Sequence, residues 1–346
     1  MFGVSSASLG NLFVHILFFI PILFMLINTD ERYDSFSKFI FWVIAFFVSV
    51  SIADNIRLCL TNPIFMLEVS REKLDLASGT NIGGFHFYSA ILFFFIICFF
   101  GLLNCKNKKV QFAFIGVIML SAIFIFAFCM KAGIIVYSLF AIVLLYLARR
   151  ERRLRLFFVK VAVPSLIVYA IVSINTDFIV EHISNLFDNP RLTQRLIVLV
   201  DADNAEAESG AATVDARGNL WMLSVNTWLK DPINFVFGIG DHRVDWDGGQ
   251  TAEQVGIGQH SDFFDTPARY GLIGLIIITL ILARSFKYLL AFYGKEYKVQ
   301  LVVIFLVFVM FGFTYGVYHP AIGFVMFVFL PMMKRVIEIK PQSRVK

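Results

Sequence analysis

Residues 110–148 form an apolar stretch of 39 residues in which Lys131 is the one charged side chain. As a straight helix this stretch would be about 58 Å long, roughly twice the ~30 Å thickness of the bilayer hydrocarbon. The chain must therefore turn back near the middle, at the sequence CMKAG, and cross twice. Similar apolar runs recur along the chain, and 58% of its residues are hydrophobic. The sequence predicts an all-α fold, a polytopic transmembrane helical bundle.

The apolar runs predict about nine membrane spans, separated by polar segments. These spans are residues 10–28, 39–57, 85–104, 110–130, 132–148, 156–174, 267–288, 299–318 and 321–336. They divide the chain into three regions. Residues 1–174 hold the N-terminal transmembrane helices, residues 175–266 form a large loop, and residues 267–346 hold the C-terminal helices and a basic tail.

The distribution of charge predicts how the spans are oriented. The sequence RRERRLR at 149–155 is the strongest basic cluster, and the basic residues of 105–109, 293–298 and the C-terminal tail agree with it. By the positive-inside rule these segments are cytoplasmic and the large loop is periplasmic. Between residues 176 and 265 there are 15 acidic and five basic residues, so membrane topology explains the charge pattern and no nucleic-acid partner is expected. The N-terminus then falls outside, which predicts either a first helix that inserts N-out or further spans upstream.

The large loop is expected to contain short amphipathic helices. In the sequence NLWMLSVNTWL at 219–229, the spacing places Trp221, Val225 and Trp228 on one helical face. Tryptophans on such a face suit the membrane interface. Residues 201–216 are acidic and predict a mobile hairpin, and the glycines of FVFGIGD predict a reversal of the chain.

Cations on the predicted outer side are candidates for binding an anion. Lys131 lies at membrane depth, where a charge is by default a functional candidate, although a lysine snorkelling from a turn is an equal alternative. Arg217 precedes the amphipathic helix, and Arg191 and Arg195 precede the acidic segment. Guanidinium groups match phosphate oxygens bidentately. Pairing with the loop carboxylates is the alternative; it is preferred for Arg191 and Arg195 but not for Arg217.

The sequence GIGQHSDFFDTPARYGLIGL at 256–275 places His260 beside Asp262 and Asp265, just before an apolar span. An imidazole can accept a proton from a hydroxyl near neutral pH. The alternative is a loop histidine that is hydrogen-bonded at a helix start. Thr266 and Pro267 are expected to be the N-cap and the first residue of that helix.

No metal or cofactor is expected. The sequence RVDWDGG at 243–249 has the carboxylate spacing of part of an EF-hand loop but lacks the required ligands at both ends. His-x-x-x-His and Cys-x-x-Cys pairs are absent from the sequence, which disfavours zinc.

The order of these features resembles the O-antigen polymerase/O-antigen ligase superfamily of bacterial inner membranes. The order is a cation after a short outer turn, a basic cytoplasmic loop, ARGNLW, an amphipathic helix, FGIG and then the His260 segment. The resemblance covers roughly residues 110–290, and the His260 segment is its most specific part. Two departures are Lys131, where the family more often has arginine, and Ser261, where asparagine is common after the histidine.

The resemblance implies a GT-C-like, metal-independent, inverting glycosyltransferase that needs no cofactor and uses an undecaprenyl-diphosphate-linked oligosaccharide. Lys131 and Arg217, with Arg191 and Arg195, would stabilise the charge on the diphosphate leaving group. His260 would orient or deprotonate the acceptor hydroxyl, and Asp262 and Asp265 would bind sugar hydroxyls or orient the imidazole.

Three functions remain open on the sequence. A surface-polysaccharide polymerase is preferred, with a chain-length regulator and a flippase as expected partners. The nearest alternative is the ligase that transfers the glycan to lipid A–core. A flippase for the same lipid is the third, but the sequence has no inverted repeat or paired broken helices to favour a transporter.

Overall fold

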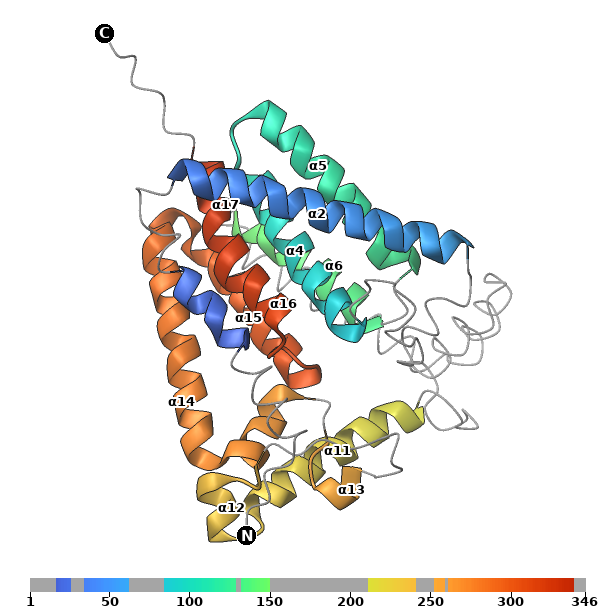
Figure 1. Cartoon of the computed structure of the whole chain (residues 1–346), viewed down its shortest axis with the longest axis vertical. Helices are drawn as coiled ribbons and strands as arrows, with labels where there is room; N and C mark the ends of the chain where they lie inside the picture. Colours follow the sequence, from blue (N-terminus) through green and yellow to red (C-terminus); the bar gives the residue numbers. More distant parts are fainter. Residues whose placement is uncertain are drawn as a thin grey trace. The chain divides into compact units, whose positions relative to one another are not determined.

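The computed structural model describes residues 17–25, 34–61, 84–128, 132–149, 211–240, 252–258 and 261–338. Every regular element among these residues is helical (Figure 1). The chain divides into two compact units. Unit 1 comprises Met1–Arg149 with Leu275–Lys346, and unit 2 comprises Arg150–Gly274.

The helices of unit 1 account for most of the apolar runs. They are α2 (Asp34–Thr61), α4 (Gly84–Asn104), α5 (Lys108–Ile123) with its π-helical continuation η3 (Phe124–Phe128), α6 (Ala132–Ala148), the part of α14 (Asp262–Tyr293) after Gly274, η6 (Lys295–Tyr297), α15 (Lys298–Thr314), α16 (Pro320–Phe324), η7 (Val325–Phe329) and α17 (Leu330–Ile337). Unit 2 contains α11 (Ala211–Leu229), α12 (Pro232–Phe237), α13 (Ala252–Val255) and the start of α14.

Helix α4 forms the core of unit 1. All of its residues from Tyr88 to Cys98 are buried, because the helix is apolar on every face and packs against α5, α6, α16 and α17 (Figure 1). Helix α2 is different: it buries Phe41 but exposes Phe46 and Phe47 by more than 60% each. Large exposed apolar side chains along a long helix are suited to contact with lipid.

The described helices confirm a multi-pass membrane protein. Five helical segments are long and apolar enough to cross a bilayer: Asp34–Thr61, Lys108–Ala127, Asp262–Tyr293, Lys295–Thr314 and Pro320–Ile337. The apolar helices Tyr88–Asn104 and Gly133–Ala148 are shorter. Of the other two predicted spans, 10–28 is described only from residue 17 to 25, and 156–174 lies outside the described residues. The nine-span prediction is therefore supported in part.

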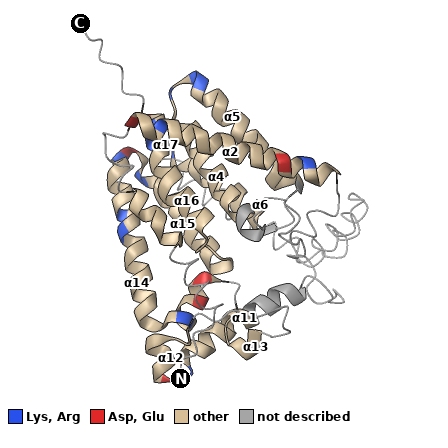
Figure 2. Cartoon of the chain, in the orientation of Figure 1, with Lys and Arg blue, Asp and Glu red and all other residues tan. Residues whose placement is uncertain are grey.

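One end of unit 1 collects basic residues. Asn104, at the end of α4, donates a hydrogen bond to Gln300 near the start of α15 at 2.8 Å. The hydroxyl of Tyr293, at the end of α14, donates to the carbonyl of Leu330 in α17. The basic residues in or next to these helix ends are Lys106, Lys108, Lys109, Lys295, Lys298, Lys334 and Arg335. Figure 2 shows the charged residues of this unit mostly near helix ends. We call this the basic end.

The turns predicted to lie on the other side of the membrane meet at the opposite end. The hydroxyls of Tyr137 in α6 and Thr314 in α15 are hydrogen-bonded at 2.9 Å. Gly133, in the first turn of α6, packs so closely on the Tyr315 ring that a Cβ there would overlap it. Lys131 itself lies outside the described residues, but α6 begins at this end directly after it.

Replacing Tyr137 with phenylalanine should lower the free energy of unfolding by about 1 kcal/mol, the typical net value of one hydrogen bond. The hydroxyl bonds both Thr314 and the carbonyl of Met310, at 2.9 and 3.1 Å, and ties α6 to α15. Thermal unfolding in detergent micelles measures the change. Ser138→Ala is the control, because the Ser138 hydroxyl bonds only the carbonyl of Ile134 in its own helix among the contacts described. Equal unfolding midpoints for the two variants would contradict the expectation.

Candidate functional site

The helix that follows His260 begins earlier than the sequence predicts. Helix α14 starts at Asp262, and Ser261 caps it: the Ser261 hydroxyl accepts from the amide of Phe264 at 3.3 Å, and its carbonyl accepts from the amide of Asp265 at 2.8 Å. The prediction that Thr266 and Pro267 begin the helix is therefore wrong. Pro267 lies inside it, because the serine cap forms the first turn without help from the proline.

Gly271 interrupts α14 with a backbone that only glycine adopts readily, φ 63° and ψ −167°. An uninterrupted helix would bond the carbonyls of Ala268 and Arg269 to amides four residues later. Here the chain of the FGIG segment supplies the donors instead: the amide of Ile239 donates to Ala268 and that of Gly240 donates to Arg269, both at 2.9 Å. These two hydrogen bonds satisfy the carbonyls that the break in α14 leaves without helical donors.

The tryptophan face of α11 packs within unit 2. Trp221 stacks on Phe264 of α14 with ring centroids 5.5 Å apart. Trp228 stacks on Phe235 of α12 at 5.2 Å and donates its indole N–H to the carbonyl of that residue at 3.0 Å. The predicted helix at 219–229 is thus confirmed. It begins already at Ala211, so the hairpin prediction is wrong for residues 211–216, and the remainder of 201–216 lies outside the described residues.

A buried polar chain lies beneath the His260 segment. Ser224 of α11 is fully buried, and its hydroxyl donates to Oδ1 of Asp265 at 2.6 Å while accepting from the amide of Gly258 at 2.9 Å. Asp265 is only 2% exposed. The positive charge of Arg269, one turn further along α14, interacts favourably with the Asp265 carboxylate. Both partners offset part of the cost of burying this carboxylate.

The predicted site residues are only partly within the described structure. His260, Lys131, Arg191 and Arg195 lie outside the described residues. Arg217 lies on α11, though only its backbone is described. Asp262 is the partly exposed first residue of α14, and Asp265 is in the interior on Ser224. Asp265 therefore contacts α11, whereas Asp262, three residues earlier in the sequence, is partly exposed at the start of α14.

Sequence reasoning missed Ser224 and Arg269. Arg269 follows Asp265 by four residues, the spacing at which opposite charges meet on a helix, so this signal was present. Ser224 is three residues after Trp221 and four before Trp228, on the same buried face. A lone serine on such a face carries no further signal in one sequence, because its partners lie more than 30 positions away.

The residues described offer no evident metal site, and a large groove in unit 1 is unsuited to the chemistry. Among them, no three His, Cys, Asp or Glu side chains lie close enough to share a metal ion.

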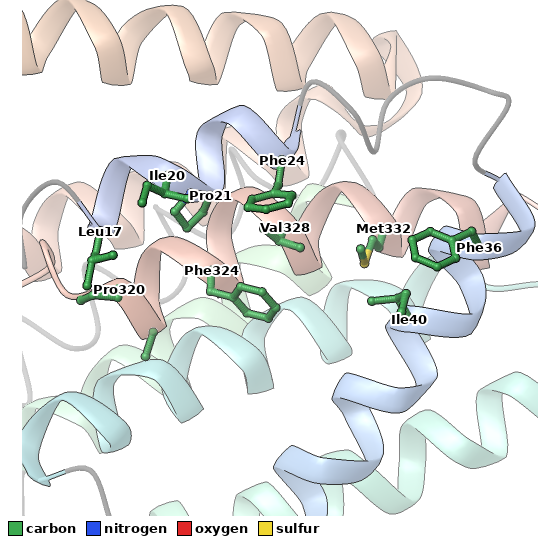
Figure 3. Close-up of a pocket in the computed structure, with 11 residues that line it drawn as sticks. Leu17, Ile20, Pro21, Phe24, Phe36, Ile40, Pro320, Phe324, Val328 and Met332 are labelled. Carbon is green, nitrogen blue, oxygen red and sulfur yellow. The ribbon is translucent and has the colours of Figure 1, made fainter.

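The groove in unit 1 has a volume of about 680 Å³ and lies between residues 17–25, the start of α2 and the α16–α17 segment (Figure 3). Its lining is apolar, from Leu17 and Pro320 to Phe36 and Met332, so it can take a hydrocarbon chain but cannot stabilise a diphosphate.

Comparison with known proteins identifies the segment that carries these features. No curated protein matches the chain. Residues 130–279 match the family model Wzy_C, described as O-antigen ligase. The matched segment contains Lys131, all of α11 and the first half of α14. The match confirms the resemblance drawn from the sequence: residues 130–279 of this multi-pass membrane protein match a family model of the O-antigen polymerase/O-antigen ligase superfamily.

Proposed function

We propose that the protein is a surface-polysaccharide polymerase that transfers a growing glycan from polyprenyl diphosphate onto a new lipid-linked repeat unit. The family match to residues 130–279 carries the proposal. The packing of unit 2 supports it. A Cβ at Gly258, two residues before His260, would overlap the carbonyl of Leu220, three residues after Arg217. The segment that ends two residues before His260 therefore packs against α11, the helix that carries Arg217.

The proposed reaction is a single displacement at the anomeric carbon. The acceptor hydroxyl attacks, the bond from that carbon to the lipid diphosphate breaks, and the configuration inverts. In this reaction His260 is the general base and accepts the proton of the acceptor hydroxyl. Arg217 and Lys131, with Arg191 and Arg195, stabilise the additional negative charge that develops on the departing diphosphate. The reaction uses no metal in this proposal.

The charge pattern of the sequence supports a periplasmic site. Residues 176–265 contain 15 acidic and five basic residues, whereas the basic residues of 293–298 follow the span predicted at 267–288. The positive-inside rule assigns the basic side to the cytoplasm of a bacterial inner membrane. The loop that contains His260 would then lie at the periplasmic face, where a lipid-linked diphosphate and an aqueous sugar meet.

The ligase remains a second candidate, because the matching family model is itself described as O-antigen ligase. A ligase would use the same donor and the same cations. It would transfer the finished glycan to lipid A–core in place of a lipid-linked repeat unit. The flippase alternative has no such observation in its favour.

Deleting the gene in its host and separating the surface polysaccharide by gel electrophoresis distinguishes these functions. We expect core that carries a single repeat unit, because ligation continues when polymerisation stops. Core without any glycan, together with polymer still attached to the lipid, would indicate the ligase. An unchanged ladder of long chains would contradict both. A plasmid copy of the full-length gene is the control and should restore the ladder. A loss of chain-length control alone would point to the regulator expected as a partner.

A further inference from the structure

The Ser224 hydroxyl joins three segments of unit 2 with one oxygen atom. A hydroxyl has one proton to donate and lone pairs to accept with. The carboxylate of Asp265 can only accept, so it takes the proton, at 2.6 Å. One of the two lone pairs of the hydroxyl oxygen accepts a hydrogen bond from the amide of Gly258, at 2.9 Å. The donors and acceptors are therefore determined: the Gly258 amide donates to the Ser224 hydroxyl, and that hydroxyl donates to the Asp265 carboxylate.

Close backbone packing holds the segment before His260 against α11. Gly256 has φ 79°, and a Cβ there would lie 2.9 Å from the hydroxyl of Thr227. Ile257 is fully buried, and Gly258 leaves no space for a side chain beside Leu220. This stretch therefore lies directly on the helix, over two of its turns.

The segment after His260 is fixed to the same helix. Ser261 caps α14, and its carbonyl accepts from the amide of Asp265. Asp265 then receives the Ser224 hydroxyl, and Phe264 stacks on Trp221. The chain is thus attached to α11 two residues before His260 and again five residues after it, and one hydroxyl takes part in both attachments.

We propose that Ser224 is a positioning residue of the glycosyl transfer, and that it acts by fixing both flanks of the His260 segment to α11. This inference rests on the proposed function, in which His260 accepts the proton of the acceptor hydroxyl. Ser224 is fully buried, so it cannot touch the substrate itself. Its effect must reach the reaction through the placement of His260 relative to the helix that carries Arg217.

The expected effect is on turnover more than on substrate binding. A displacement of a reacting group by about 1 Å can lower a rate by about 10²-fold. Removing the hydroxyl leaves the Gly258 amide without its acceptor and Asp265 without one of its donors, so the turn is free to shift. Affinity for the lipid-linked substrate depends on the cations and the lipid tail, which this change does not touch.

The test compares three serine variants of the full-length protein. Ser224→Ala removes both hydrogen bonds, Ser224→Thr keeps a hydroxyl, and Ser138→Ala removes a buried serine hydroxyl that bonds only its own helix among the contacts described. The proteins are placed in phospholipid nanodiscs. Lipid-linked repeat units extracted from the deletion strain are the substrate. Turnover at saturation, the half-saturating concentration and the unfolding midpoint are measured for each, with rates given per folded molecule.

We expect Ser224→Ala to lower turnover by about 10- to 100-fold while the half-saturating concentration changes less than about twofold. Ser224→Thr should recover most of the rate, and Ser138→Ala should equal the wild type. If Ser224→Ala does not fold, Ser224→Cys replaces it, because a thiol keeps the shape but bonds weakly.

Two results would overturn the inference. One is an Ala or Cys variant as active as Ser138→Ala. The other is a loss of rate that the threonine does not repair, since packing alone would explain it. His260→Ala separates this failure from failure of the proposed function. An active His260→Ala variant rejects the role of the histidine, whereas an inactive one beside an active Ser224→Ala variant rejects only the positioning role.

Discussion

Replacing His260 with alanine should lower the rate of polymerisation by about 10²–10⁴-fold, the usual contribution of a general base. The acceptor hydroxyl would then have no side chain to take its proton. The measurement is the polysaccharide ladder of a deletion strain that carries the variant, followed by the rate of the purified protein. His319→Ala is the matched control. The ring of His319 accepts the amide of Ala321 at 3.3 Å at the start of α16, so its loss removes the cap of that helix.

Arg217→Ala should have a comparable effect in the same assay, about 10²–10³-fold, because the departing diphosphate loses a positively charged donor. Lysine at this position should recover only part of the rate, since it cannot bond two oxygens in one plane. Lys230→Ala removes an exposed cation just after the end of α11 and is the control. Complete ladders from both the His260 and the Arg217 variant would refute the assignment of the site.

Gly271→Ala should lower the free energy of unfolding by about 3–5 kcal/mol, which combines a backbone strain with a steric overlap. The φ of 63° at this position is unfavourable for any residue with a Cβ. The added carbon would also overlap the carbonyl of Val236 in α12. Such a loss is a large part of the stability of an ordinary domain. The measurement is the midpoint of unfolding in detergent, together with the yield of monodisperse protein.

Gly116→Ala is the control for this variant, because nothing lies within 4 Å of a Cβ at that position in α5. It should be neutral or should stabilise the protein by up to about 1 kcal/mol, since alanine is the better helix former. Gly238→Ala should resemble Gly271→Ala, because Gly238 has φ 73° and its Cβ would overlap the carbonyl of Arg269. A Gly271→Ala variant as stable as Gly116→Ala would show that the break in α14 can relax without cost.

Periodicity and hydropathy predicted the helices well where the signal is local. The spans at 85–104, 132–148 and 321–336 agree with α4, α6 and the α16–α17 segment within a few residues. Moving a long apolar run out of water is favourable whether lipid or protein surrounds it. The residue range of such a helix can therefore be predicted from composition alone. The helix at 219–229 followed in the same way from the spacing of its tryptophans.

The start of α14 shows the limit of local signals. Thr266 and Pro267 have the residue types of a helix start, yet Ser261 makes the cap. The difference arises because Phe264 and Asp265 are held by Trp221 and Ser224, which lie about 40 residues away in the sequence. Tertiary contacts decide between two local starts that have similar propensity.

By itself, the sequence determined the membrane class, the positions of the basic and acidic segments and the segment that resembles a known family, because each depends on residue composition or on short-range order. The tertiary structure alone decided that α14 breaks at Gly271, that FGIG supplies the missing donors, and that Ser224 meets Gly258 and Asp265. These hydrogen bonds pair buried polar groups that are far apart in the sequence, because each buried group needs a partner. Local sequence patterns do not indicate which distant group that partner is.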